Sequence, residues 1–528
     1  MSLQWFLSRT VPTDTAELGR AILREGNLHR QIGDRFDELF PDERAFAGMY
    51  DPTGRGALPP LLCSLVTVFQ MMEKVGDRLA AEYVVTRIDW KYGLHLPLRY
   101  GGFHFTDLSA YRQRLLAHGE ERALFDQFLA RLKALGLFKV RGKMRTDSTH
   151  LLAVVERLSQ LELVAESLRL AVLAAQETAS EWAEGALPET FFQAYSQRQS
   201  EYGLSERQVA ERLVKAGKDG FWFLAQVDGT APPVVQHLPE VATLRTVLEQ
   251  QFPRGTDGPP AAKRPSGKKV IESPHETQAR YSTKRGQGWI GYKVQVTETY
   301  DPELPHLIVD LEGTGALDND SPELPHIQAR LAQRDLLPGE QQVDQGYMSG
   351  RNLVESAQLG IDLLGVPLQD TQGPAGFRQS DFQIDEGTHQ ATCPAGHTSR
   401  IWAERHLPEV EEPAIQIRFE AQTCQQCPFF GRCTSSRQGR SLTLHPYRVA
   451  LAARRAQAQS MVFRERLHPR AGIEGTISEL VRAYRLRWAR YRGLAKVRLQ
   501  AYFTAVAANL RRLVRWWTRP QTAGVPAG

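Results

Sequence analysis

Residues 137–148 read LFKVRGKMRTDS, and this stretch decides the fold because strand character begins here, after a long segment with mainly helical periodicity. Alternation of apolar and polar residues is typical of a β-strand with one buried face. The stretch reaches an aspartate, Asp147, which is followed by the hydroxyl side chains of Ser148 and Thr149. We therefore expect the first strand of a sheet here, and we expect it to end on a carboxylate.

Further strands are expected downstream, with helices between them. In GWIGYKVQVTETY (288–300), apolar residues alternate with polar ones, as in a half-buried strand. The same reading gives strands within 306–315, 340–350 and 361–368, and helices at 321–335 and 351–360. Strands that alternate with helices predict a mixed α/β sheet with helices packed on it.

The rest of the chain divides into helical blocks, a linker and a turn-rich segment. Helical periodicity covers most of the first 136 residues and returns over 158–217, before a Pro/Gly/Lys-rich linker at 252–270. Short strands and turns are expected from about residue 370 to 445. The segment 475–517 is predicted to be helical, with an apolar stripe that runs from Ile477 to Tyr491.

Length and composition are those of an ordinary globular protein with roughly two to four domains. Of the 528 residues, 42% are hydrophobic and 24% are charged. No run approaches the ~18 uncharged apolar residues of a membrane span. The start, MSLQWFLSRTVPTDT, lacks the basic-then-apolar order of a signal peptide. We therefore expect a cytosolic protein.

Positive charge is concentrated toward the C-terminus. Residues 440–519 contain eighteen Lys or Arg against three Glu, although the net charge of the whole chain is only +5. Such a segment predicts a polyanionic partner, and nucleic acid is the default candidate. The alternative is that long Arg side chains cover helix surfaces.

Two aspartates are candidate ligands of a divalent metal. Mg²⁺ prefers oxygen ligands, and phosphodiester chemistry needs several carboxylates that converge from different elements. Asp147 and Asp344 each end a predicted strand of the sheet, so both could point into one crevice at its edge. The alternative is that each aspartate only forms a turn or caps a helix, which is the commoner role of a strand-end Asp.

A third carboxylate, Glu474, lies at the head of the basic C-terminal segment. If the helix includes it, Glu474 falls on the same line as Arg485 and Arg492. The carboxylate could then hold a metal ion while the neighbouring arginines neutralise phosphate. The alternative is a capping box formed by Thr476 and Glu479, which would start the helix after Glu474.

Four of the five cysteines lie close together in the sequence. Cys63 stands alone in an apolar stretch and is expected to be a buried core thiol. The others resemble the ligands of a tetrahedral zinc ribbon, and His397 could replace one sulfur; they are Cys393, Cys424, Cys427 and Cys433. The alternative to structural Zn²⁺ is a set of free thiols. A disulfide framework of the secreted type does not fit so few cysteines.

A Gly-rich basic stretch, KRGQGWIGYK (284–293), holds Lys284, Arg285 and Lys293. These cations could contact a DNA backbone or could merely solvate the edge of a hairpin. The chain has no G-x-x-x-x-G-K-[ST] phosphate loop, so nothing supports the use of ATP.

Several motifs in this order give the chain a family resemblance. They are RTDSTH (145–150), SPHETQARYSTKRGQGWIGYKVQVTET (273–299), VDQGYMSG (343–350), CQQCPFFGRC (424–433) and HPRAGIEGTISELVRAYRLRWARYRGLAKVRLQAYFTAVAANLRR (468–512). Together they resemble a bacterial DDE transposase, and specifically the IS1182 group of the IS4/IS5-type superfamily. The resemblance covers about residues 40 to 515.

The resemblance implies a catalytic core similar to ribonuclease H, with Asp147, Asp344 and Glu474 as the catalytic and metal-binding acids for Mg²⁺ or Mn²⁺. A helical insertion and a zinc-ribbon-like insertion would interrupt this core. The implied domains are an N-terminal helical region that binds DNA ends (1–136), a core (137–149, 280–369 and 446–518), a helical insertion with linker (150–279), a zinc-ribbon-like insertion (370–445) and a tail (519–528).

The superfamily also has a Tyr-Arg-Glu-Lys signature, from which this sequence departs. Arg470 occupies the arginine position, but Leu467 stands at the tyrosine position and Val481 at the lysine position. Arg482, next to Val481, could take over the phosphate contact. The full set of expected DNA-binding residues is Arg470, Arg482, Arg485, Arg492, Lys496, Lys284 and Lys293.

The function implied is that of a bacterial transposase, located in the cytoplasm at the nucleoid. It would bind the terminal inverted repeats of an insertion sequence, cleave the ends and join the 3′-hydroxyl strands to target DNA. Double-stranded DNA would be its partner, and a homodimer would hold two ends in a synaptic complex. The alternatives are a nuclease of the same fold that does not transpose, and a zinc-stabilised DNA-binding protein without catalysis.

Overall fold

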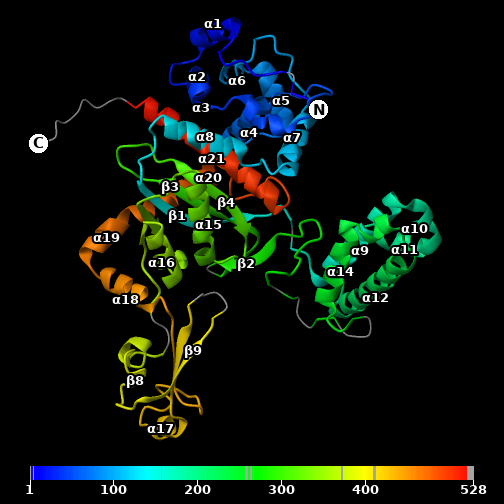
Figure 1. Ribbon diagram of the computed structural model, residues 1–528. Coiled ribbons are helices and arrows are strands. Elements are labelled where there is room, and N and C mark those ends of the chain that lie inside the picture. Colours follow the sequence, from blue (N-terminus) through cyan, green and yellow to red (C-terminus); the bar gives the residue numbers. More distant parts are fainter. Residues whose placement is uncertain are drawn as a thin grey trace, which may run out of the picture. The chain divides into compact units, whose positions relative to one another are not determined.

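The computed structural model describes residues 2–3, 5–155, 157–255, 260–261, 265, 267–284, 286–369, 373–407 and 412–519 (Figure 1). The chain forms two compact units, and each is built from segments that are far apart in the sequence. Unit 1 comprises Met1–Phe138, Asp147–Asp318 and Ile473–Gly528, and unit 2 comprises Lys139–Thr146 and Asn319–Gly472. None of the described helices is both long and apolar enough to cross a membrane.

The N-terminal part of unit 1 is a set of short helices. Its central helix, α4 (Pro60–Glu73), is buried from Pro60 to Met72, so that every face of it meets protein. Cys63 lies on α4 and is 2% exposed, which confirms that it is a core thiol. The other elements are α1 (Thr13–Ile22), α2 (Leu28–Asp34), α3 (Phe36–Leu39), η1 (Glu43–Met49), α5 (Asp77–Thr86), α6 (Ile88–Gly93), α7 (Thr106–Ala117) and α8 (Ala123–Ala134).

Unit 1 also holds a helical segment with its own apolar core. Helices α9 (Gln160–Thr178), α12 (Glu206–Thr230) and α14 (Pro239–Gln251) pack against one another (Figure 1). Capping boxes at Ser159 and Ser205 fix the starts of α9 and α12. The shorter helices are α10 (Ser180–Ala186), α11 (Glu189–Tyr195) and α13 (Pro233–Gln236).

A six-stranded sheet has the order β2-β3-β1-β5-β6, with β4 paired to β3. Strand β3 pairs antiparallel with β2 and with β4, whereas β5 pairs parallel with β1 and with β6. The prediction of a mixed α/β fold is therefore confirmed. The strands are β1 (Lys143–Leu152), β2 (Arg280–Lys284), β3 (Gln287–Thr299), β4 (Ile308–Gly315), β5 (Glu340–Val343) and β6 (Asp362–Leu364).

Unit 2 adds helices and two small sheets. One sheet has the order β11-β10-β9 and the other pairs β7 with β8. Their strands are β7 (Gln383–Asp385), β8 (Gln390–Thr392), β9 (Ser399–Arg405), β10 (Ala414–Phe419) and β11 (Ser441–Leu444). The helices of this unit are α15 (Asp320–Gln333), η3 (Gln345–Tyr347), α16 (Gly350–Gln358), η4 (Gln379–Asp381), α17 (Ala421–Gln426), α18 (Arg448–Gln457), α19 (Met461–Leu467) and η5 (His468–Ala471).

The basic C-terminal segment forms two helices, α20 (Gly472–Tyr484) and α21 (Leu494–Trp517). The predicted stripe from Ile477 to Tyr491 is therefore wrong beyond Tyr484. Arg485 has a left-handed φ of 57°, and the backbone after it bonds to β1 instead of continuing the helix. Leu152 N donates to Arg487 O, and Ala489 N donates to Leu152 O, each over 2.8 Å.

Helix α21 begins after Gly493, whose φ is 94°. It is buried continuously from Leu499 to Leu510 and packs against β4 and α4. A helix that is apolar all round is a core helix. Much of the C-terminal segment that the sequence marks as basic is therefore the interior of unit 1.

Candidate active site

Asp147 lies within β1 and not at its end. Strand β1 continues to Leu152, so the prediction that Asp147 ends the strand is wrong. The parallel pairing of β1 with β5 ends just before Asp147, and its last pair joins Thr146 to Val343. Asp147 is half-buried, and its Oδ1 accepts the N–H of Ser148 over 2.7 Å.

Asp344 follows β5 directly, as the sequence predicts for a strand-end aspartate. It is the N-cap of η3, and its Oδ1 accepts the N–H of Gln345 over 2.7 Å. Its side chain is exposed. Asp147 and Asp344 thus each follow directly after one member of the last ladder pair, Thr146–Val343. In each case one carboxylate oxygen accepts the N–H of the next residue.

Glu474 lies in the first turn of α20 and is exposed. The alternative, a capping box at Thr476 and Glu479, is wrong, because both side chains have other partners. Thr476 Oγ1 donates to Glu298 Oε2 over 2.6 Å, and Glu479 Oε2 accepts from the guanidinium of Arg512 over 2.7 Å. With these tertiary contacts the helix starts earlier, at Gly472, and includes Glu474.

Glu474 does not share a helix with Arg485 or Arg492, contrary to the sequence prediction. Helix α20 ends at Tyr484, and both arginines belong to the non-helical stretch before α21. The two guanidinium groups are exposed. Helical spacing therefore does not determine where Arg485 and Arg492 lie relative to Glu474.

Arg145 is a residue of this region that the sequence analysis did not single out. It is 8% exposed, and its Nη1 donates to Pro469 O over 2.6 Å, within unit 2. Arg145 lies two residues before Asp147 on β1, and Pro469 lies five residues before Glu474. The bond therefore fastens the strand that leads to one acid to the segment that leads to the other. The signal for Arg145 that the sequence offered was a basic residue at a buried position of the predicted strand.

The predicted DNA-binding cations differ in exposure. Lys293 is half-buried, and its Nζ donates to Asp318 O over 2.8 Å, so it braces a turn. Arg470 is half-buried within η5. Five others have exposed side chains: Lys284, Arg482, Arg485, Arg492 and Lys496. Arg285 lies outside the described residues.

The four clustered cysteines line one small cavity of unit 2, together with His397. Cys424 lies on α17, and its Sγ accepts the N–H of Arg440 over 3.4 Å. Burial raises the pKa of the Cys433 thiol. Arg440 opposes this shift, whereas the three neighbouring cysteines reinforce it. No three of the cysteine and histidine ligand atoms described at this cavity lie within 4.8 Å of one another.

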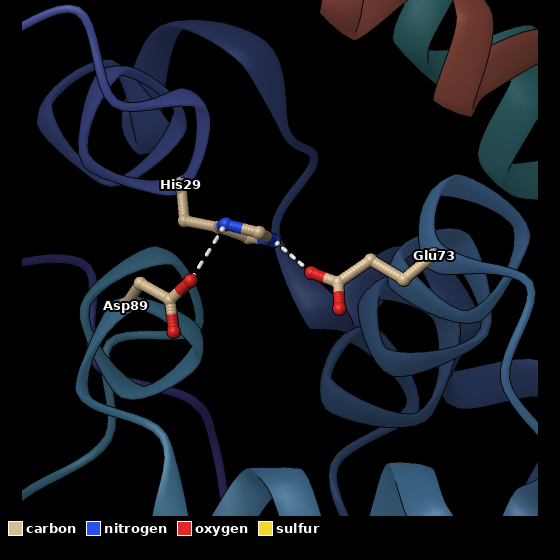
Figure 2. Close-up of side chains that lie close together, drawn as sticks. All are labelled: His29, Glu73 and Asp89. Carbon is tan, nitrogen blue, oxygen red and sulfur yellow. Dashed lines mark ion pairs between the residues drawn. The ribbon is translucent and has the colours of Figure 1, made fainter.

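His29, Glu73 and Asp89 form the one group within the described ranges whose three ligand atoms all lie within 4.8 Å of one another. Figure 2 shows the imidazole between the two acids, with Nε2 3.4 Å from Glu73 and Nδ1 3.4 Å from Asp89. The two nitrogens face opposite ways, so the ring joins α2 to α4 and α6 and does not present both acids to one ion.

Arg87 completes this N-terminal cluster by contacting both carboxylates. Burial tends to raise the pKa of Asp89, but bonds from His29 and Arg87 outweigh it and hold that pKa well below its usual range. Trp90 Nε1 also donates to Glu73 Oε1 over 2.9 Å. The acids are thus engaged by protein donors, and the cluster is a structural brace. Its members are too far apart in the sequence to be recognised there.

Two segments of the chain match family models of transposases. Residues 392–514 match the Transposase DDE domain, and residues 17–114 match the Transposase domain (DUF772). These matches support a transposase, and the matched domains imply a DNA substrate and the use of a divalent metal.

In this order along the chain, the two matches indicate a DDE transposase of the IS1182-type arrangement, which confirms the resemblance read from the motifs. The DDE match includes Glu474 and the four clustered cysteines, whereas Asp147 and Asp344 lie before it. No curated protein and no solved structure matches the chain.

Proposed function

We propose that this protein is the transposase of an insertion sequence. It binds the terminal inverted repeats of the element, cleaves the ends and transfers the 3′-hydroxyl strands to target DNA. The observation that carries the proposal is the parallel register of β1 and β5, which places Asp147 and Asp344 one residue beyond the same ladder pair. The N-terminal start of α20 supplies Glu474 as the third acid.

The proposed catalytic core is similar to ribonuclease H. In chain order, its five strands are β1, β3, β4, β5 and β6, and their sheet order is β4-β3-β1-β5-β6 once the edge strand β2 is set aside. One acid then comes from the first strand, one from the end of the fourth and one from the later helix α20. Helices α9 to α14 form an insertion between the first and second of these strands.

The three acids suit Mg²⁺ or Mn²⁺, because all their donor atoms are carboxylate oxygens on separate elements. Asp147, Asp344 and Glu474 would hold the metal, which would supply activation of the attacking water or 3′-hydroxyl and stabilisation of the leaving oxygen. The N–H groups of Ser148 and Gln345 fix one oxygen each of Asp147 and Asp344, so those carboxylates are oriented before metal arrives. The exposed cations listed above neutralise backbone phosphate.

We test this function by cleavage of a labelled duplex that carries the element's own end, in Mg²⁺ or in EDTA. Wild type is expected to cut and join with Mg²⁺ only, and Asp344→Asn is expected to lose at least about 100-fold in rate. Asp42→Asn is the matched control, since Asp42 is also an exposed N-cap of a 3-10 helix, and its Oδ1 accepts the N–H of Arg44.

The outcomes separate the candidate functions. Cleaved ends that never join to target DNA would favour a nuclease that does not transpose. Tight binding without cleavage would favour a DNA-binding protein without catalysis. Cleavage that Asp344→Asn leaves intact would remove the assigned site.

The cysteine cluster is proposed to hold one structural Zn²⁺ through Cys393, Cys424, Cys427 and Cys433. Four thiols around one small cavity support this, and so does the Arg440 N–H bond to a sulfur, which would stabilise a thiolate. We expect about one zinc per chain in purified protein and none in Cys424→Ser. Zinc-free wild type with four titratable thiols would establish the free-thiol alternative.

Cutting two ends together requires two active sites, so we propose that the transposase acts as a homodimer within a synaptic complex. Light scattering with and without end duplex tests this assembly. A protein that stays monomeric and binds only one DNA end would overturn this proposal.

A further inference from the structure

Strand β9, in the turn-rich segment of unit 2, has one edge without a ladder partner. It is the last strand of the order β11-β10-β9, and among the described strands only β10 forms a ladder with it. Strand β8 lies beside its start, since Thr392 bridges to Thr398, and residues 400–405 lie beyond that bridge. Native proteins usually keep free edges short or covered, because the unpaired backbone groups are a template for another strand. At seven residues, β9 is long enough to pair.

The side chains of β9 are mostly exposed, including apolar ones. Trp402 is half-buried, lies opposite Ile417 in the ladder and stacks on His389 with ring centroids 5.5 Å apart. Ile401, on the other face of the sheet, is 42% exposed. Five of the seven side chains are exposed, namely Arg400, Ile401, Ala403, Glu404 and Arg405. Apolar side chains along a free edge indicate a surface that another strand can cover.

The central stretch RIWAE (400–404) is complementary to itself when it runs antiparallel. Pairing with a second copy, centred on Trp402, places Arg400 opposite Glu404 of that copy. It also places Ile401 opposite Ala403, and symmetry repeats both contacts. Side chains directly opposite each other lie about 4.5–5.5 Å apart, so opposite charges attract and like charges repel. Charged edge residues usually prevent pairing, but in this register they favour it.

Both charges are available to a second copy. Glu404 is exposed and has no ion-pair partner among the described residues. Arg400 contacts Glu420 of its own chain, but its side chain is 69% exposed, and a guanidinium has five N–H donors. An additional carboxylate can therefore bind Arg400 without displacing Glu420.

The charge of the surrounding segment favours protein over DNA as the partner. Residues 370–445 contain seven Arg and no Lys against nine Asp or Glu, so this segment is net negative. A surface that binds DNA carries an excess of positive charge, because it must neutralise phosphates. The segment therefore matches a second protein surface better than a duplex.

We propose that β9 pairs antiparallel with β9 of a second copy of this chain, with Trp402 on the two-fold axis. The two three-stranded sheets then form one continuous sheet across the copies. Each copy contributes the same surface, as in other two-fold symmetric dimers. The inference rests on the proposed function, since it names a contact surface of the proposed homodimer.

We test this pairing by sedimentation velocity of the full chain at several concentrations, alone and with end duplex. Arg400→Glu brings like negative charges together across the axis, and Glu404→Arg brings like positive charges together. Each variant alone should weaken the dimer at least about tenfold, because two attractive pairs become two repulsive ones. An equimolar mixture of the two variants should recover dimers, since each supplies the charge that the other lacks. A general loss of stability cannot produce this recovery.

Arg418→Glu is the matched control. Arg418 is exposed on β10, the inner neighbour of β9, so the substitution makes the same charge change on the same sheet but away from the free edge. We expect the dimer dissociation constant to change by less than about twofold, because no charge of the second copy lies directly opposite.

The proposal is overturned if wild type stays monomeric both alone and with end duplex. It is also overturned if both edge variants dimerise as well as wild type, or if their mixture recovers no dimer. A third contrary result is unchanged dimerisation while Arg400→Glu weakens duplex binding and Glu404→Arg strengthens it. Strand β9 would then lie against DNA.

Failure of the β9 contact is distinct from failure of the proposed function. Wild type that cleaves and joins DNA while both edge variants dimerise normally loses only the β9 contact. Charge-dependent dimerisation without any cleavage by wild type keeps the contact and removes the transposase mechanism.

Discussion

Glu43 is a buried carboxylate that gives stability a pH dependence. Its side chain is 3% exposed, and its oxygens accept the N–H groups of Leu7 and Leu61 over 2.7 and 3.2 Å. Burial raises the pKa of Glu43 to about 7, and the two backbone bonds offset that rise only in part. The protonated form is therefore favoured by folding.

An unfolded glutamate titrates near pH 4.3, so the folded state binds this proton more tightly. The stabilising contribution is complete below about pH 4 and is lost as pH rises through about 7. Between about pH 5 and 8, the free energy of unfolding of wild type should fall by about 2 kcal/mol relative to Glu43→Gln. Urea unfolding at each pH measures this difference. If the free energy of unfolding changed with pH equally in the two proteins, Glu43 would be ionised in the folded state over this pH range.

Because Gly472 has no side chain, there is room beside it for the Arg145 guanidinium. A Cβ at Gly472 would overlap the Arg145 guanidinium, whereas a Cβ at Gly475 on the same helix meets nothing within 4 Å. Gly472→Ala should displace Arg145 from Pro469 and shift the segment that leads to Glu474. Misplacement by about 1 Å costs up to ~100-fold in rate, so cleavage should fall by at least about tenfold.

Gly475→Ala is the matched control for that substitution. It should keep the cleavage rate and stabilise α20 by up to about 1 kcal/mol, because alanine is the better helix former. Cleavage rates and thermal midpoints of the two variants provide the comparison. Equal cleavage by both variants would show that Arg145 does not position the site.

At the scale of elements, the break between α20 and α21 ends at Gly493, whose backbone conformation lets α21 begin. Its φ of 94° and ψ of 141° lie near a region that only glycine adopts easily, and its N–H donates to Glu276 Oε2 over 2.9 Å. Gly493→Ala should therefore lower the free energy of unfolding by about 1–3 kcal/mol. Calorimetry measures the shift. An unchanged midpoint would mean that the turn relaxes without strain.

The same break shows where sequence reasoning succeeds and where it fails. Alternation in 288–300 and the run of strands and helices after it predicted the mixed sheet, because side chains on a half-buried strand repeat every two residues. Helical periodicity could not predict the end of α20 at Tyr484, since the bonds that stop it come from Leu152, more than three hundred residues earlier. For the same reason Arg485 and Arg492 were expected on the helix of Glu474, which ends before both of them.

The position of one proposed acid was easier to predict than the contacts around another. Asp344 directly follows a short strand, and that local pattern is visible in the sequence. The contacts that fix the start of α20 ahead of Glu474, from Thr476 to Glu298 and from Arg512 to Glu479, join distant segments and leave no local pattern. The capping-box reading was wrong because tertiary partners outweigh a local cap.

At the scale of the whole molecule, binding to DNA should depend steeply on salt. Each phosphate contact that is neutralised releases counterions, and loss of one contact lowers the slope of log K against log salt by about one. Arg492→Ala combined with Lys496→Ala should therefore reduce the slope by about two, as measured by anisotropy with end duplex at several KCl concentrations. Both side chains are exposed.

The control for this measurement is Arg207→Ala combined with Lys215→Ala on α12. Both cations are exposed, and each already faces a carboxylate of its own helix, Glu211 and Asp219 respectively. We expect no change of slope for this pair. A slope that falls equally for both double variants would mean that the insertion helices also lie on DNA.

The six helices α9 to α14 enclose their own core between β1 and β3, two strands that are neighbours in the sheet order. Asp344 lies 197 positions after Asp147, and residues 153–279, between β1 and β2, make up 127 of the 196 residues between them without changing the strand order. Relatives with a short hairpin at this point would keep the same sheet. Genome surveys that require a fixed spacing between the two aspartates would overlook them, and surveys that follow strand order would not.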